Sequence, residues 1–131
     1  MRLLVDTHIV LWRMTADPRL PQRAIELMDD ETNSVAVSAV SVWEVAIKSA
    51  LGREGSPGLP LSGADFLAEL RAVGLSPLPI TAEQITALDG LPLHHSDPFD
   101  RLLVAQARHE AMYLLTHDQQ LAAYGDRVLV V

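Results

Sequence analysis

The chain has 131 residues, 49% of them hydrophobic, and this length and composition suit one domain with one sizeable core over residues 1–131. The absence of cysteine excludes disulfide bonds and thiolate metal sites, and the formal net charge of −7 argues against a protein that coats nucleic acid nonspecifically. No secretory segment follows Met1 and no apolar run approaches the roughly 18 residues of a membrane span, so we expect a soluble cytoplasmic protein without membrane contacts.

The first part of the chain alternates short apolar runs with helical patterns. The elements predicted there are a buried strand at 2–5, a short helix that includes 9–12, a helix at 21–30 with Pro21 at a possible first helical position, a buried strand at 34–37, and a helix at 41–51 closed by Gly52. The following stretch, residues 52–63 (GREGSPGLPLSG), is rich in Gly, Pro and Ser and predicts a mobile loop.

The second part continues the alternation. The predicted elements are a helix at 64–73, a Pro-interrupted edge strand at 75–80, a helix at 81–88 that opens with a Thr-x-x-Gln capping box, a helix that begins near Pro98, a strand at 113–116, a short helix at 118–124 and a last strand at 127–131. Because short apolar strands alternate with helices, we expect an α/β sandwich around a mostly parallel sheet of four to five strands.

Four acidic residues fall at one edge of this predicted sheet. Asp6 closes the first strand and Asp118 follows the strand at 113–116. Glu44 lies in the first turn after the second strand, and Asp100 lies in the first turn of the helix near Pro98. In an open parallel sheet, the carboxyl ends of strands and the amino ends of the following helices share one edge, where ligands bind. We therefore expect the four acids to point toward one crevice.

Three of these positions also have a purely structural explanation. Ser41-Val-Trp-Glu44 has the form of a capping box, with Lys48 four residues later as a possible ion-pair partner. Asp97 occupies an N-cap position, Asp100 is favourable near the dipole of the helix that follows, and Asp118 suits the cap of the next short helix. Asp6 is different, because a lone carboxylate at the end of an apolar strand is partly desolvated and has its pKa raised.

A divalent cation would offset the repulsion among these carboxylates. Mg²⁺ and Mn²⁺ prefer oxygen ligands, and a site of this kind activates a water for attack on a phosphodiester. Within the segment 97–100 we assign Asp97 to helix capping and Asp100 to chemistry, because Asp100 is in line with the buried face of the helix. Asp97 remains a second candidate for the metal, since an N-cap carboxylate can also face the crevice.

Four motifs, in this order and spanning nearly the whole chain, resemble the PIN-domain ribonucleases, specifically the VapC-type toxins of toxin–antitoxin pairs. They are MRLLVDTHIVLW at the start, SAVSVWEVAIK at 38–48, LPLHHSDPFDRLLVAQA at 91–107 and LLTHDQQLAAYG at 114–125. The resemblance implies a PIN-like α/β/α sandwich and an endoribonuclease that depends on Mg²⁺ or Mn²⁺ and usually cleaves tRNA or rRNA. It also implies a homodimer and a VapB-type antitoxin whose C-terminal segment enters the active-site groove.

The resemblance also assigns roles to particular residues. The acidic quartet of the family matches Asp6, Glu44, Asp100 and Asp118, and the family's hydroxyl residue before the last acid matches Thr116. By this likeness all five are catalytic, and the four acids hold the metal.

Other residues near the predicted edge have two readings each. His8, His94, His95 and His117 lack the spacing of a zinc site and fit better as contacts to RNA phosphate or as support for the acids. Basic residues at this edge suit either the RNA backbone or salt bridges, namely Arg13, Lys48 and Arg101. Core packing is the default for Trp12, Met14 and Trp43, although an exposed Trp12 and Met14 would suit a groove for an apolar antitoxin segment.

Two other classes of function compete with the ribonuclease. An acidic-site phosphohydrolase or receiver-like domain would favour an Asp-x-Asp pattern, whereas here Asp6 is followed by Thr7 and His8. A noncatalytic α/β binding module would use the acids only as helix caps.

Overall fold

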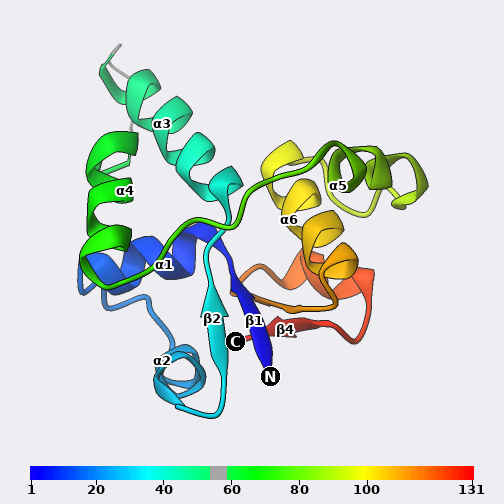
Figure 1. Ribbon diagram of the computed structural model, residues 1–131, viewed down its shortest axis with the longest axis horizontal. Helices are drawn as coiled ribbons and strands as arrows, with labels where there is room; N and C mark the ends of the chain where they lie inside the picture. Colours follow the sequence, from blue (N-terminus) through cyan, green and yellow to red (C-terminus); the bar gives the residue numbers. More distant parts are fainter. Residues whose placement is uncertain (54–58) are drawn as a thin grey trace.

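In the computed structural model, which describes residues 1–53 and 59–131, a four-stranded sheet of order β2-β1-β3-β4 lies at the centre (Figure 1). Its strands are β1 (Arg2–Val5), β2 (Ser34–Ala36), β3 (Tyr113–Thr116) and β4 (Val128–Val130). All three pairings are parallel, which confirms the predicted α/β architecture and the parallel sheet.

Helices cover both faces of this sheet. They are α1 (Thr7–Met14), α2 (Gln22–Asp29), α3 (Ala39–Arg53), α4 (Gly63–Ala72), α5 (Ala82–Thr86) and α6 (Pro98–His109), with two 3₁₀ turns, η1 (Ala87–Gly90) and η2 (Gln119–Tyr124). Helices α1, α2 and α4 lie on one side of the strands, and α5 and α6 lie on the other (Figure 1). Within the described ranges, no helix is both long and apolar enough to cross a membrane.

The alternation of side chains along the strands divides the core in two. Leu3 and Val5 belong to the cluster under α1, α2 and α4, whereas Leu4 points to the opposite face and packs with α6. The neighbouring strand β3 follows the same alternation, since Leu115 joins the first cluster and Leu114 the second. All five side chains are completely buried. A slip of one residue would move each of them to the opposite face, so packing on both faces fixes the register.

The strand order creates a switch point between β1 and β3. From β1 the chain crosses to β2 on one side, and it later returns through α6 to β3 on the other side of β1. A crevice forms at the carboxyl ends of two strands related in this way. The backbone N–H of Asp6 donates to the carbonyl of Leu115 at 2.9 Å, so Asp6 sits directly beside the end of β3.

The predicted edge strand at 75–80 is wrong. The structure has only an isolated parallel bridge there, between Ser38 and Leu78. Leu78 N–H donates to the Val37 carbonyl at 2.8 Å, but its neighbours Pro77 and Pro79 have no N–H to extend a ladder.

Several predicted boundaries also shift. Helix α3 begins at Ala39 and runs past Gly52 to Arg53, rather than spanning 41–51. Pro21 is the N-cap of α2 and not its first helical residue. The strand predicted at 34–37 is only partly buried, because β2 is at the edge of the sheet. Of the loop predicted at 52–63, residues 54–58 lie outside the described part of the chain.

Local signals that depend on near neighbours are confirmed. The Thr-x-x-Gln pattern forms a complete capping box, with Gln84 N–H donating to Thr81 Oγ1 at 3.2 Å and Thr81 N–H donating to Gln84 Oε1 at 3.0 Å. Asp97 is the N-cap of α6, followed by Pro98 in its first turn. Asp118 caps the short helix after β3, which is a 3₁₀ turn.

Candidate functional site

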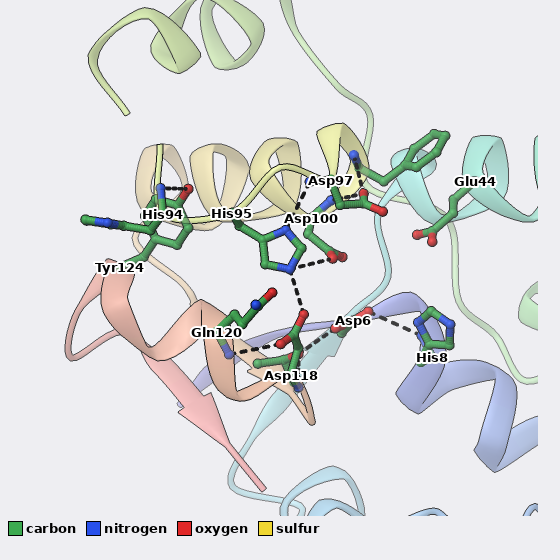
Figure 2. Close-up of polar contacts among 12 residues, drawn as sticks. Asp6, His8, Glu44, His94, His95, Asp97, Asp100, Asp118, Gln120 and Tyr124 are labelled. Atoms are coloured by element: carbon green, nitrogen blue, oxygen red, sulfur yellow. Dashed lines mark hydrogen bonds and ion pairs between the residues drawn. The ribbon is translucent and has the colours of Figure 1, made fainter. Parts of the chain in front are cut away.

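A crevice at the carboxyl edge of the sheet brings three of the four predicted acids together. Its cavity of about 180 Å³ is lined by Asp6, His8, Trp12, Asp100, His117 and Asp118. Figure 2 shows the carboxylates of Asp6, Asp100 and Asp118 turned toward a common space, each from a different element. The side chain of Glu44 lies on the far side of Asp6 and does not line this cavity.

Asp6 is held rigidly at the bottom of the crevice, where it is 4% exposed. As the N-cap of α1 it accepts a hydrogen bond from His8 N–H at 3.3 Å through Oδ1. Thr116 Oγ1 donates to its Oδ2 at 2.5 Å and itself accepts from Asp118 N–H at 3.1 Å. Burial raises the pKa of Asp6, although the bond from Thr116 and the charge of His8 act in the opposite direction. Thr116 therefore joins Asp6 to the loop that carries Asp118.

Asp100 projects from the first turn of α6 into the same space. Desolvation, followed by the negative charges of Asp6, Asp97, Glu44 and Asp118, raises the pKa of Asp100 to about 8. The neighbouring Asp97 has a separate task, since its Oδ1 accepts from Phe99 N–H at 2.8 Å and from Asp100 N–H at 3.1 Å. Asp97 thus caps the helix as predicted, while Asp100 lines the crevice.

Glu44 is not the capping residue that its spacing from Ser41 suggested. Because α3 starts earlier than predicted, Ser38 takes the capping position and its Oγ accepts from Val40 N–H at 3.0 Å. Ser41 instead accepts a bond from Thr7 Oγ1 at 2.8 Å inside the core. Glu44 is only 1% exposed, and its Oε1 has no hydrogen-bond partner within the part of the chain that the structure describes.

The other oxygen of Glu44 makes the predicted ion pair. Lys48 Nζ lies 2.5 Å from Glu44 Oε2, one turn along the same helix. Burial alone would lower the pKa of Lys48, but the bond to Glu44 and the charges of Asp97 and Asp100 outweigh it, and the pKa is raised. Lys48 therefore remains a cation, and its positive charge offsets the negative charge of one of these clustered carboxylates.

His95, one of the histidines expected either to contact RNA phosphate or to support the acids, lies among these carboxylates. Its ring is 9% exposed, and Nε2 lies 2.8 Å from Asp118 Oδ2 and 3.6 Å from Asp100 Oδ2 (Figure 2). Its Nδ1 accepts a hydrogen bond from Asp97 N–H at 3.1 Å. One atom from each of His95, Asp100 and Asp118 lies within 4.8 Å of the others, a spacing that would allow a shared cation. In the sequence, the indication of this position is that His95 lies two residues before Asp97, the N-cap of α6.

His94 and His117 make different contacts. His94 is turned toward Tyr124, with ring centroids 5.1 Å apart and a bond from its own N–H to the Tyr124 hydroxyl. The ring of His117 contacts Trp12 at 5.4 Å, and its Nδ1 lies 2.5 Å from the Val131 carbonyl. These contacts do not gather the histidines into the zinc site considered from the sequence.

The predicted basic residues mostly have protein partners. Arg13 pairs with Asp29 at 3.0 Å, and Arg101 donates to the Leu91 carbonyl at 2.9 Å. These contacts agree with the alternative in which the basic residues bond within the protein, rather than the one in which they are free to bind an RNA phosphate.

The large apolar residues near the site differ in burial. Trp12 is partly buried against the core beneath α1, and Met14 lines a separate apolar cavity of about 270 Å³ together with residues of β2 and α4. Both side chains therefore pack against the core while remaining only partly buried. Trp43 is 49% exposed, so the expectation that it packs in the core is wrong, although it contacts Phe99 with ring centroids 4.7 Å apart.

Comparison with known proteins agrees with this architecture. A family model described as PIN domain matches residues 3–127. Ribonuclease VapC22 of Mycobacterium tuberculosis is 29% identical over 123 residues, which cover 93% of this chain and 91% of that protein. VapBC2 from Rickettsia felis, bound to a promoter DNA fragment, aligns with a TM-score of 0.66 and 16% identity over 100% of this chain and 98% of that one. FitAcB from Neisseria gonorrhoeae aligns with a TM-score of 0.63 and 18% identity, covering 98% and 96%.

Proposed function

Since this chain belongs to the PIN-domain family, we propose that it is a metal-dependent endoribonuclease and the toxin of a VapBC-type toxin–antitoxin pair. The observation that carries the proposal is the convergence of Asp6, Asp100 and Asp118 on one crevice, beside a buried Glu44 that has an unpartnered oxygen. Its similarity to a protein named as a ribonuclease supports the nuclease activity.

The residues present suit a hard divalent cation, Mg²⁺ or Mn²⁺. The four acids are carboxylates, which are the donors these ions prefer. The pKa of Asp100 is raised first by desolvation and then by the negative charges of the neighbouring carboxylates. Glu44 Oε1 is a buried acceptor without a donor in the described ranges. We propose that Asp6, Glu44, Asp100 and Asp118 hold the cation, with Asp97 as a further candidate.

When bound, the cation would lower the pKa of a water and stabilise negative charge on the phosphate. The chain's own residues prepare the site. Thr116 fixes the orientation of the Asp6 carboxylate through its short hydrogen bond. Lys48 places a positive charge beside the buried side chain of Glu44, where an unpaired carboxylate would be costly. Asp100 must release its proton before it can act as a ligand. Hydrolysis then adds one water across a P–O bond of the RNA.

The substrate and partners follow from the resemblance. We propose cytoplasmic tRNA or rRNA as the substrate, a VapB-type antitoxin as the inhibitor, and a homodimer as the working form. The solved structures similar in fold are VapBC2 and FitAcB assemblies, which supports an antitoxin partner for this chain.

The decisive experiment is cleavage of purified tRNA and rRNA with Mg²⁺, with Mn²⁺ and with EDTA. We expect cleavage only with a divalent ion, and we expect Asp6→Asn and Asp100→Asn to lose at least about 100-fold in rate, since several kcal/mol of charge stabilisation disappear. Glu83→Gln, which changes an exposed acid of α5 remote from the crevice, is the matched control. Cleavage that persists in EDTA, or in both Asn variants, would refute the proposal.

Calorimetry separates the competing classes. A noncatalytic module whose acids only cap helices would show no saturable binding of Mg²⁺ or Mn²⁺, whereas the nuclease should bind and Asp6→Asn should weaken that binding. A phosphohydrolase would bind the ion but hydrolyse a phosphomonoester in place of RNA.

A further inference from the structure

We propose that His95 is a positioning residue of this site: its imidazole carries a proton on Nε2, donates a hydrogen bond from that nitrogen to Asp118, and is not a ligand of the cation. The inference rests on the proposed function only in taking the neighbouring carboxylates as metal ligands. It concerns a residue outside the acidic quartet.

Judged by distance alone, His95 would be a ligand of the cation. His95 Nε2 lies among the oxygens of Asp100 and Asp118, and the three ligand atoms are within 4.8 Å of one another. Imidazole is a common metal ligand, and it suits Zn²⁺, Ni²⁺ and Cu²⁺ better than Mg²⁺. A histidine ligand would therefore give this site a different metal preference from an all-carboxylate site.

The backbone of the loop before α6 decides between the two roles. Asp97 N–H points at His95 Nδ1 with a distance of 3.1 Å, as Figure 2 shows. A backbone N–H can only donate, so Nδ1 must present its lone pair. In a neutral imidazole the single N–H is then on Nε2. The partner of Nε2 is a carboxylate oxygen of Asp118 at 2.8 Å, which is an acceptor, so both contacts require the same tautomer.

Coordination through Nε2 would break this arrangement. The proton would have to move to Nδ1, where it would face Asp97 N–H, and two donors would meet at a hydrogen-bond distance. The position of Asp97 N–H is itself fixed, because the Asp97 side chain caps α6 through Phe99 and Asp100. The helix cap thus selects the tautomer of the histidine that precedes it.

The bond from His95 completes the orientation of Asp118. Gln120 N–H donates to Asp118 Oδ1 at 2.9 Å, while His95 donates to Oδ2. With a donor on each oxygen, the carboxylate cannot rotate freely, and each oxygen keeps a lone pair for another partner. The same bond ties the loop before α6, the helix that carries Asp100, to the loop after β3, which carries Asp118.

The test measures cation binding and the tautomer separately. His95→Ala should weaken Mg²⁺ and Mn²⁺ binding by about 10- to 100-fold, the usual effect of removing a group that orients a ligand. His95→Gln, which keeps an N–H donor near the position of Nε2, should recover most of this loss. His94→Ala, in the same loop but turned toward Tyr124, is the control and should bind as the wild type does.

The ratio of Ni²⁺ to Mg²⁺ affinity distinguishes a ligand from a positioning residue. We expect this ratio to be the same in wild type, His95→Ala and His95→Gln. A selective loss of Ni²⁺ affinity in both variants would show that His95 coordinates the ion, and would overturn the inference.

Imidazole ¹⁵N NMR of the metal-free protein tests the tautomer without any cation. A proton on Nε2 of His95, retained when Mg²⁺ is added, supports the inference, and a proton on Nδ1 overturns it. A wild type that binds no divalent ion would contradict the proposed function, whereas the NMR result bears on His95 alone.

Discussion

At the scale of single residues, the crowding of carboxylates gives Asp100 an unusual titration. Its pKa is raised from 3.8 to about 8, first by desolvation and then by the surrounding acids. Without a divalent ion, the folded protein therefore keeps a proton on Asp100 at neutral pH, while the unfolded chain loses it near its ordinary value. The unfolded state binds fewer protons than the folded state across this interval.

This difference predicts how stability depends on pH. In EDTA, the contribution of Asp100 to the free energy of unfolding should be fully present below pH 3.8 and should fall as the pH rises toward about 8. Asp100→Asn should remove this decline and stabilise the metal-free protein at pH 8, and saturating Mg²⁺ should also reverse it in the wild type. Urea unfolding at several pH values measures the effect. If the free energies of unfolding of the wild type and of Asp100→Asn changed in parallel with pH, the raised pKa of Asp100 would be contradicted.

The neighbouring Asp97 should respond differently to the same substitution. Asn also caps helices well, so Asp97→Asn should keep the bonds to Phe99 and Asp100 N–H and cost less than about 1 kcal/mol in stability. We expect it to retain substantial RNA cleavage, compared under the same conditions with Asp100→Asn. An equal loss of rate in the two variants would show that Asp97 is also a metal ligand.

At the scale of elements, β3 connects the core to the site. Leu114 is completely buried against α6, and two residues later Thr116 holds Asp6. Leu114→Ala should reduce the free energy of unfolding by about 2–5 kcal/mol through lost burial and a residual cavity. Leu93→Ala, at a side chain that is 78% exposed, should change it by less than about 0.5 kcal/mol. Denaturant titration of both variants checks this, and similar losses would mean that the β3 register differs from the one described.

At the scale of the whole molecule, the exposed side of α3 gives the expected homodimer a candidate surface. Trp43, Ile47 and Leu51 follow one another at intervals of four residues, and each is 45–50% exposed. An acidic chain has little to gain from polar contacts with its own copy, so an apolar stripe is the surface that would favour self-association.

Light scattering after size exclusion tests this surface. The wild type should have twice the chain mass of 14.3 kDa, and Ile47→Glu should elute as a monomer. Ile85→Glu, which places the same charge at a side chain that is 46% exposed on α5, is the matched control and should remain dimeric. A dimer that survives Ile47→Glu would place the interface elsewhere.

The sequence by itself determined the features that depend on near neighbours. The Thr81–Gln84 capping box and the Asp97 cap arise from interactions within about four residues, and both are present in the structure. The predicted order of strands and helices is also present, apart from the strand expected at 75–80. The parallel order of strands also placed Asp6, Asp100 and Asp118 at one edge, because helices begin where such strands end.

Only the tertiary structure decided what depends on residues far apart in the chain. Asp6 and Thr116 are bonded across 110 positions, and His95 meets Asp118 across 23. The burial of Glu44 and the start of α3 at Ala39 follow from packing between elements. A local sequence pattern carries no information on which distant donor hydrogen-bonds to a given carboxylate. That partner depends on how the helices and loops pack against the sheet.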